Sequence, residues 1–321
     1  MKTGKVEIVG FIIMLALGVS LFTLREGRDL GGKFNLNGLL GGPTLVAKVF
    51  IEPTNPALVA RAAFVYDLTT GKTLFAKNAT TSQPLASITK LMTALVAYEA
   101  VPHSTVITIH GADLAQEGDS GLFSQERWRL KDLLDFTLMS SSNDGASALA
   151  SLGATPDESG KIRAEFVAKM NAKAVELGLT QMHFTDVTGL DIGTTTDETL
   201  AVVKPPIATA FGSAQDVAKL FAHILNVHPE ILEATRYQKI SFTSLSQFKH
   251  TATNTNISVN TLPGIIGAKT GLTELAGGNL VVGFDVGFGH PVVAVVLGST
   301  VDGRFVYMGA LASSPRAFFG K

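Results

Sequence analysis

The stretch PLASITKLMTALVAYE, residues 84–99, combines the signals of a helix with two side chains that can do chemistry. Pro84 precedes the expected helix, and apolar residues then recur at helical spacing: Ile88, Leu91, Met92, Leu95 and Val96. On a helix, Ser87 and Lys90 project from one face about one turn apart, so their side chains can touch. The segment therefore predicts a largely apolar helix that opens with a candidate nucleophile and its base.

A serine hydroxyl becomes a good nucleophile only when a base removes its proton. A lysine can be that base if burial or a nearby positive charge lowers its pKa. The free N–H groups at the start of a helix can also stabilise an oxyanion. The alternative is that Ser87 caps the helix and Lys90 is exposed, because the spacing S-x-x-K occurs by chance in many proteins.

The segments around this helix predict an α+β fold. Two apolar alternating runs within residues 61–78 flank a turn at Thr69–Gly71 and indicate a hairpin. Further helices are expected over 129–140, 143–152, 159–178, 213–225 and 303–312, and further strands over 105–109, 239–245, 264–271, 279–286 and 291–300. This order favours an antiparallel sheet shared by sequence-distant strands and covered by helices, with a site between two lobes.

Bulk composition narrows the classes of function. The chain is 46% hydrophobic and 17% charged with a formal net charge of −1, which indicates a globular protein without the basic surface that nucleic acids require. We therefore expect no nucleic-acid partner. The absence of cysteine excludes thiol nucleophiles, disulfides and cysteine-based zinc sites.

The N-terminus predicts membrane attachment. Lys2 and Lys5 precede an apolar run, residues 8–24, which reaches the lower limit for a transmembrane helix. A cleaved signal peptide is the alternative, but its apolar core would be shorter and followed by a small-residue cleavage site. We expect a cytoplasmic segment (1–7), a transmembrane signal anchor (8–24), a Gly- and Asn-rich flexible tether (25–56) and a catalytic domain (57–321) outside the cytoplasm.

Two more motifs change the interpretation of Ser87 and Lys90. SSND at 141–144 places Ser141 and Asn143 at a junction between two helices, and KTG at 269–271 lies on a predicted strand. In this order, S-x-x-K, S-x-N and K-T-G resemble the three signature elements of penicillin-binding proteins and serine β-lactamases. The surrounding stretches, including FVYDLTTGKTLFAKN, LGLTQMHFTDVTGLD and GIIGAKTGLTELAGGNLV, resemble the D-alanyl-D-alanine carboxypeptidase family of low-molecular-mass penicillin-binding proteins from about Ala62 to Thr300.

The resemblance implies the penicillin-binding-protein-like transpeptidase fold: an antiparallel sheet covered by helices plus a mainly helical lobe. It also implies a role for each matching residue. Ser87 is expected to be acylated, Lys90 to act as its general base, and Ser141 to relay a proton to the leaving amine. Asn143 is expected to bind the substrate backbone.

On the KTG strand, Lys269 is expected to attract the terminal carboxylate and to depress the pKa of Lys90, while Thr270 hydrogen-bonds that carboxylate. Gly271 leaves room for the substrate, and the backbone N–H groups of Ser87 and Leu272 form the oxyanion hole. The expected ligands are peptidoglycan stem peptides, with β-lactams as covalent inhibitors. No cofactor or metal is implied.

Several alternatives stay open. Endopeptidase cleavage of peptidoglycan cross-links uses the same chemistry. A class A β-lactamase is disfavoured because no E-x-x-L-N stretch lies between Asn143 and Lys269, and a non-catalytic peptidoglycan binder has no need of an activated serine. GDSG at 118–121 is typical of chymotrypsin-like proteases, but Ser120 is expected to be structural because this chain has a helical middle.

Two stretches differ from the family pattern. The 50 residues that follow Gly271 have room for two strands and a helix, so we expect the C-terminal β-rich domain of many relatives to be missing. The segment 191–212 is longer than the usual connection and either overhangs the cleft or is a tolerated surface insertion.

Overall fold

The computed structural model describes residues 59–118, 120–152, 159–193, 196–197, 202–203, 206–287 and 289–319. The predicted cytoplasmic segment, membrane anchor and tether, residues 1–56, lie outside this set. Within it, no helix combines the length and the apolar character that crossing a bilayer requires.

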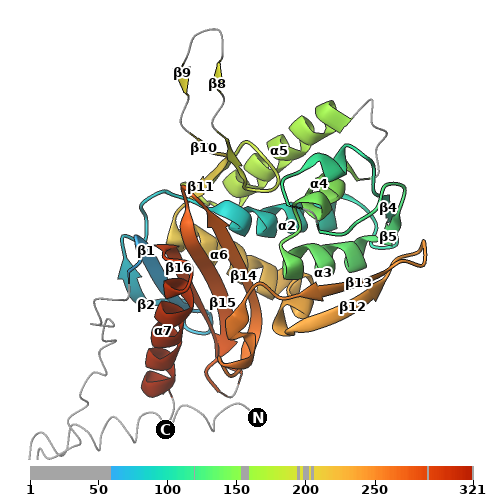
Figure 1. The fold of residues 1–321 in the computed structure, drawn as a ribbon. Helices are drawn as coiled ribbons and strands as arrows, with labels where there is room; N and C mark the ends of the chain where they lie inside the picture. The colour runs from blue at the N-terminus through green and yellow to red at the C-terminus, as the bar shows by residue number, and fades with distance from the viewer. Residues whose placement is uncertain are drawn as a thin grey trace, which may run out of the picture. The chain divides into compact units, whose positions relative to one another are not determined.

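A five-stranded antiparallel sheet organises the domain (Figure 1). Its order is β14 (Ile265–Thr273), β15 (Gly277–Asp285), β16 (Pro291–Ser299), β1 (Ala62–Asp67) and β2 (Lys72–Lys77). The first strand therefore pairs with the last, with Ala62 opposite Leu297 and Asp67 opposite Val292. This pairing brings the first and the last strand of the described chain side by side and leaves β14, which carries KTG, at an edge of the sheet.

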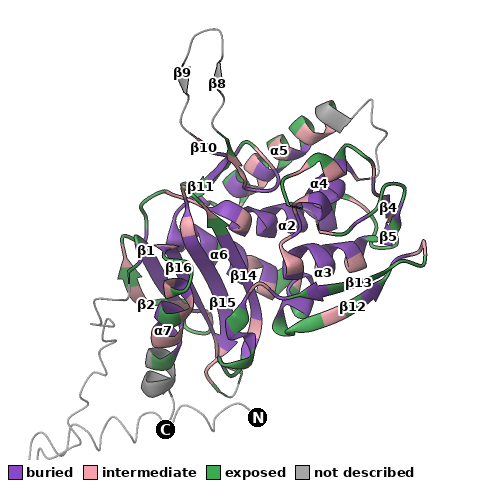
Figure 2. Cartoon of the chain, in the orientation of Figure 1, coloured by how far each residue is buried: buried purple, intermediate pink, exposed green. Residues whose placement is uncertain are grey.

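Helices cover both faces of the sheet. α7 (Gly303–Phe319) packs on one face and α6 (Ala214–Val227) on the other. The central strands are buried on both sides, as Figure 2 shows, because their residues alternate between two cores. Val281, Val293 and Val295 face the core on the side of α6, and Leu280, Val282 and Val296 face the core under α7.

The second lobe is mainly helical and contains α2 (Lys90–Ala100), α3 (Leu130–Ser140), α4 (Asn143–Ser151) and α5 (Ser159–Glu176). α2 runs through its centre, and every residue from Lys90 to Tyr98 is buried. A helix that is apolar on all sides must be enclosed by other elements, which explains why α2 contacts α3, α4, α5 and α6.

Short elements complete the fold: 3₁₀ helices η2 (Ala86–Thr89), η3 (Asp113–Ala115), η4 (Pro229–Ile231), η5 (Glu233–Arg236) and η6 (Ile257–Asn260), and paired strands β4 (Val106–Thr108) with β5 (Arg127–Arg129), and β12 (Lys239–Thr243) with β13 (Lys249–Thr253). β3 (Gln83–Pro84), β11 (Ala210–Gly212) and β6 (His183–Phe184) form a three-stranded sheet beside η2.

The predicted start of the first helix is wrong by more than one turn. Pro84 lies in β3, opposite Phe211 of β11, and a 3₁₀ turn then leads into α2, which begins at Lys90. β13 was also not predicted, because KHTAT buries only His250 and Ala252 and carries too few apolar residues to indicate a strand.

The long segment 191–212 contains two pairs of short strands. β7 (Asp191–Ile192) pairs with β10 (Ile207–Ala208), and β8 (Thr196–Asp197) pairs with β9 (Val202–Val203). The β8–β9 pair projects from the body at the top of Figure 1. At its base, the carboxylate of Asp191 accepts a hydrogen bond from the backbone N–H of Leu275, at 3.1 Å.

Candidate active site

Ser87 lies in the 3₁₀ turn η2, immediately before α2. This turn is held from several directions: the backbone N–H of Leu85 donates to the carbonyl of Ala210 at 3.0 Å, and Asn279 Nδ2 donates to the carbonyls of Pro84 and Leu85 at 3.0 and 3.1 Å. Asn279 is fully buried on β15, so the strand next to KTG also fixes the chain that leads to the nucleophile.

The residue before Ser87 has an unusual backbone conformation. Ala86 has φ of +49°, in the left-handed region that residues with a Cβ avoid. Gly189 packs directly against it: a Cβ added at Gly189 would lie 2.0 Å from the carbonyl oxygen of Ala86. Strain of this kind persists only where surrounding contacts impose it, and it is frequent at functional sites.

Lys90 is completely buried and makes three hydrogen bonds. Its Nζ donates to Ser87 Oγ at 2.8 Å, to Asn143 Oδ1 at 2.7 Å and to the backbone carbonyl of Thr188 at 2.8 Å. Burial lowers the pKa of Lys90 to about 7, against an opposing effect of the Asp186 carboxylate. An amine with a pKa of about 7 is neutral in about half of the molecules at pH 7, and in that form it can accept the proton of the serine hydroxyl that it touches.

The SSND junction separates α3 from α4 and supplies three different functions. Ser141 ends α3 in a left-handed conformation, with φ of +60°. Ser142 is the N-cap of α4, because its Oγ accepts from the backbone N–H of Gly145 at 2.8 Å. Asn143 bridges Lys90 and the loop before β5 by donating from Nδ2 to the carbonyl of Glu117 at 2.7 Å.

Lys269 lies on β14 and is 1% exposed. Its Nζ donates to Ser141 Oγ at 2.8 Å and to the backbone carbonyl of Thr270 at 2.9 Å. Burial and the charges of Lys90 and Arg304 lower the pKa of Lys269 well below its usual value. The sequence also led us to expect that Lys269 depresses the pKa of Lys90. In the structure, burial is the cause that lowers the pKa of Lys90.

The rest of the KTG strand lies against η2. A Cβ at Gly271 would be 2.8 Å from the carbonyl of Leu85 and 3.2 Å from the Cβ of Ala86, so only glycine permits this close approach. Thr270 Oγ1 lies 2.5 Å from Thr255 Oγ1, a hydroxyl that the sequence did not single out.

β14 is an edge strand of the five-stranded sheet, so one of its sides does not pair with another strand of that sheet. Ala268 donates its backbone N–H outward, to Thr235 Oγ1 at 3.0 Å. Backbone groups alternate in direction along a strand, so the N–H of Leu272 also points out from the edge, while the carbonyl of Gly271 points inward. On that inner side, Arg304 Nη1 donates to the Gly271 carbonyl at 2.8 Å.

In the structure, Lys90 thus contacts both Ser87 and Asn143. Lys269 donates a hydrogen bond to Ser141, which lies two residues before Asn143 in the sequence. It adds four residues that sequence reasoning missed: Thr188, Asp186, Asn279 and Arg304. Thr188, Asp186 and Asn279 lie in stretches that carried the family resemblance without being singled out there, whereas Arg304 lies outside the quoted stretches.

The serine that sequence reasoning set aside lies in a structural position. Ser120 Oγ lies 2.7 Å from Ser142 Oγ and donates to Asp144 Oδ2 at 2.9 Å, so it braces the SSND junction.

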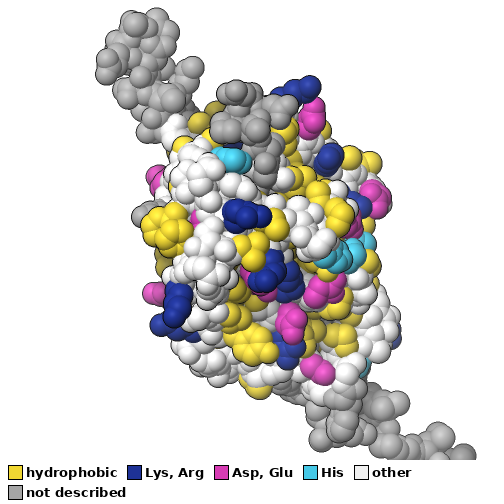
Figure 3. Space-filling model, turned by 90° about the vertical axis from the view of Figure 1, so that its right-hand side faces the viewer, with side chains coloured by type: hydrophobic (Ala, Val, Ile, Leu, Met, Phe, Trp, Pro, Cys, Tyr) yellow, Lys and Arg dark blue, Asp and Glu magenta, His cyan; other side chains and the backbone are white. Residues whose placement is uncertain are grey.

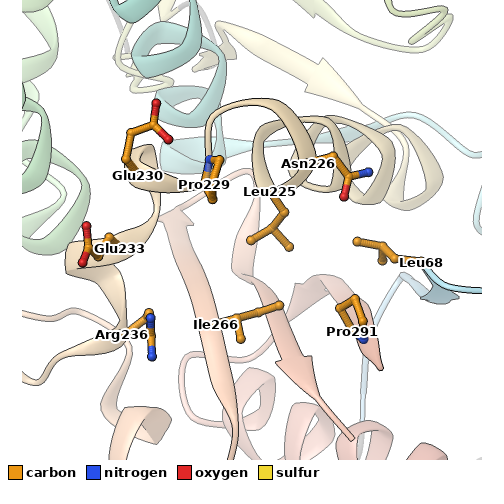
Figure 4. A pocket seen from close by; sticks show the side chains of 9 residues that line it. All are labelled: Leu68, Leu225, Asn226, Pro229, Glu230, Glu233, Arg236, Ile266 and Pro291. Atoms are coloured by element: carbon orange, nitrogen blue, oxygen red, sulfur yellow. The ribbon is translucent and has the colours of Figure 1, made fainter. Parts of the chain in front are cut away.

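A separate pocket of about 460 Å³ lies at another part of the fold (Figure 4). Leu225, Ile266 and Pro291 give it apolar walls, and Glu230, Glu233 and Arg236 lie on one side. None of the predicted site residues lines it. The chemistry therefore belongs to the Ser87 region and not to this pocket.

Comparisons with known proteins identify the family and the fold. Residues 50–301 match the family Peptidase S11, D-alanyl-D-alanine carboxypeptidase. The D-alanyl-D-alanine carboxypeptidase DacB2 of Mycobacterium tuberculosis is 28% identical over 249 residues, covering 77% of this chain and 78% of the relative. The D-alanyl-D-alanine endopeptidase of Escherichia coli is 34% identical over 158 residues, covering 47% of this chain and 48% of the relative.

Among solved structures, penicillin-binding protein D2 of Listeria monocytogenes in its ampicillin-bound form has a TM-score of 0.62 and 26% identity, covering 81% of this chain and 98% of that one. The chain also spans about half of some curated relatives, such as 51% of the carboxypeptidase DacF of Bacillus subtilis. The family match covers most of this chain and includes all three motifs. The protein therefore belongs to the D-alanyl-D-alanine carboxypeptidase family, Peptidase S11, and has the penicillin-binding-protein fold.

Proposed function

We propose that the protein is a serine D-alanyl-D-alanine carboxypeptidase that removes the terminal D-alanine from peptidoglycan stem pentapeptides through an acyl-enzyme. The observation that carries the proposal is the contact of Lys90 Nζ with Ser87 Oγ at 2.8 Å, inside a site where burial brings the pKa of Lys90 to about 7. Family membership supplies the substrate class.

In the acylation step, neutral Lys90 accepts the hydroxyl proton of Ser87 while Oγ attacks the carbonyl carbon of the D-alanyl–D-alanine bond. The oxyanion accepts hydrogen bonds from the backbone N–H groups of Ser87 and Leu272, each worth about 3 kcal/mol in such sites. Collapse breaks the C–N bond, and Ser141 relays a proton to the departing amine: it gives up its hydroxyl proton and regains one from Lys269, whose Nζ donates to Ser141 Oγ. D-alanine leaves, and the acyl group stays on Ser87.

The substrate is oriented by groups on both sides of Ser87. Lys269 and Thr270 are proposed to bind the terminal carboxylate, and the approach of that anion raises the pKa of Lys269 and so favours its charged form. Asn143 already uses Oδ1 and Nδ2 in contacts to Lys90 and Glu117. Each of these atoms retains one further hydrogen-bonding position, which can serve the peptide backbone of the substrate.

Deacylation requires water and a base. The absence from the sequence of the E-x-x-L-N stretch of class A β-lactamases leaves β-lactam acyl-enzymes without that dedicated base. We therefore propose that β-lactams inhibit this protein covalently, in line with the ampicillin-bound form of the Listeria relative.

Carboxypeptidase activity is tested by incubating the full chain in detergent with a synthetic stem pentapeptide and measuring free D-alanine. Release by the wild type and its loss in Ser87→Ala support the proposal. A wild type that a penicillin acylates, but that releases no D-alanine from the pentapeptide, would show that the substrate assignment is wrong.

Endopeptidase activity is the second candidate, favoured by the similarity to the E. coli endopeptidase over 158 residues. It uses the same attack on a bulkier leaving group. Comparing the rates for a pentapeptide and a cross-linked dimer distinguishes the two, and a faster reaction with the dimer would replace the carboxypeptidase assignment.

We also propose that residues 8–24 anchor the protein in the bacterial cell membrane as a single-pass helix, with residues 57–321 on the extracytoplasmic side. The support is the apolar run and the lysines that precede it. On the face of the domain in Figure 3, basic and acidic side chains are interspersed. That face therefore has no strongly basic patch that could hold the protein on a membrane in place of residues 8–24. Protease added to cells from which any outer membrane has been removed is expected to digest the domain, and protection under those conditions would contradict this orientation.

A further inference from the structure

Lys90 has a third partner besides Ser87 and Asn143, and that partner is held by a charged residue. The Thr188 carbonyl accepts from Lys90 Nζ at 2.8 Å, and Thr188 itself is buried. Asp186 Oδ1 accepts from the backbone N–H of Thr188 at 2.7 Å and from Thr188 Oγ1. The position of the carbonyl that binds Lys90 therefore depends on the Asp186 carboxylate.

The other oxygen of that carboxylate binds Arg163 of α5. Arg163 Nη2 donates to Asp186 Oδ2 at 2.6 Å, and the two side chains are 29% and 21% exposed, so water screens this pair only in part. Arg163 is itself fixed by Ser147 of α4 at 3.0 Å and by Gln116 at 3.2 Å. Three parts of the helical lobe thus converge on one ion pair beside the site.

The Arg163–Asp186 pair also affects the charge state of Lys90 through its electric field. The groups that contact Lys90 are neutral: the Ser87 hydroxyl, the Asn143 amide and the Thr188 carbonyl. Lys269 of β14 is a neighbouring amine, and Asp186 is the acid whose charge acts on Lys90. Asp186 stabilises a protonated Lys90. Arg163 carries the opposite charge and is expected to offset that effect, and its charge also acts on the buried Asp113, which binds the same Ser147.

We propose that Arg163 and Asp186 form a charge-balanced positioning pair that holds the Thr188 carbonyl against Lys90 and keeps that lysine available to take the proton of Ser87. Neither residue contacts the reacting atoms. Both act through Thr188 and through their fields at Lys90. The inference rests on the proposed role of Lys90 as general base.

The pair is tested with three variants of the full chain: Asp186→Asn, Arg163→Gln and the double variant. For each, the second-order rate constant of acylation by a fluorescent penicillin is measured from pH 5 to 10, and the midpoint of its acid limb is determined. Acylation of the wild type at Ser87 shows that the proposed function stands, whatever the variants do.

Removing the acid favours neutral Lys90, so Asp186→Asn is expected to move the midpoint to lower pH by about 0.5 to 1 unit. Removing the cation leaves Asp186 uncompensated, so Arg163→Gln is expected to move it to higher pH by a similar amount. The double variant is expected to return close to the wild type. Arg163→Lys keeps the charge and is expected to keep the midpoint.

The matched control is Arg129→Gln, which removes the exposed partner of Asp132, in an ion pair at 3.6 Å between the end of β5 and the first turn of α3. Its midpoint is expected not to move. Shifts of the two single variants in the same direction, or lower rates with an unmoved midpoint, would show that the pair is merely structural and would overturn the proposal. If Arg163→Gln does not fold, an unmoved midpoint in Asp186→Asn alone overturns it.

Discussion

Lys90 Nζ lies 2.8 Å from Ser87 Oγ because the 3₁₀ turn that carries the serine runs directly into the helix that carries the lysine. The same nitrogen also binds Asn143, which belongs to the SSND junction more than fifty residues later in the sequence. A short local spacing therefore builds the nucleophile and its base, and the tertiary fold encloses them.

The first prediction concerns pH. Lys90 is a base only in its neutral form, and the fraction of that form grows as pH rises through its pKa of about 7. The second-order rate constant for acylation is therefore expected to fall on the acid side of pH 7, by about 100-fold at two units below the pKa. A profile that is flat between pH 5 and 8 would contradict this role of Lys90.

The second prediction separates carboxylate recognition from chemistry. Lys269→Gln is expected to lower kcat/KM for a peptide that ends in a free carboxylate by about 100-fold, because a buried charged hydrogen bond is lost. The corresponding C-terminal amide is expected to lose much less, so the ratio of the two rates is the measurement.

The control for Lys269 is Lys249→Gln, which removes an exposed lysine of β13 and should leave both rates unchanged. Equal losses for the acid and the amide in Lys269→Gln would indicate that Lys269 supports Ser141 and does not bind the carboxylate.

The third prediction tests the support beneath the nucleophile. Gly189 has φ of +78°, and a Cβ there would meet the Ala86 carbonyl at 2.0 Å. Gly189→Ala is expected to lower the free energy of unfolding by more than about 2 kcal/mol and to reduce acylation, because either the turn at Ala86 or the chain at Gly189 must move. Urea denaturation measures the first effect.

Gly193→Ala is the matched comparison, because no atom lies within 4 Å of the Cβ it would add. Its free energy of unfolding is expected to stay within about 0.5 kcal/mol of the wild type. Equal stability of the two variants would mean that the close packing at Ala86 is not what holds the nucleophile.

The sequence predicts the parts of this site that depend on local spacing. Ser87 and Lys90 are three residues apart, Ser141 and Asn143 are two apart, and KTG is continuous, so each motif is recognisable by itself. The sharing of one antiparallel sheet by sequence-distant strands was also predicted, although the order of those strands was not. These features needed no knowledge of long-range contacts.

The remaining parts depend on contacts between distant residues. Asn279 reaches Leu85 across 194 positions, and Arg304 reaches Gly271 across 33. Both are single polar residues within apolar or mixed stretches, and no local pattern marks their partners. The 3₁₀ turn before α2 was missed for a similar reason, because it is imposed by β11 and β15 and not by the helical periodicity of residues 84–99.

The most direct test of the central claim is to incubate the full chain with a labelled penicillin and to locate the covalent adduct by peptide mass spectrometry. The account predicts one adduct, on Ser87, which disappears in Ser87→Ala and persists in Ser120→Ala. No covalent adduct, or an adduct on Ser120 or Ser141 in place of Ser87, would contradict it.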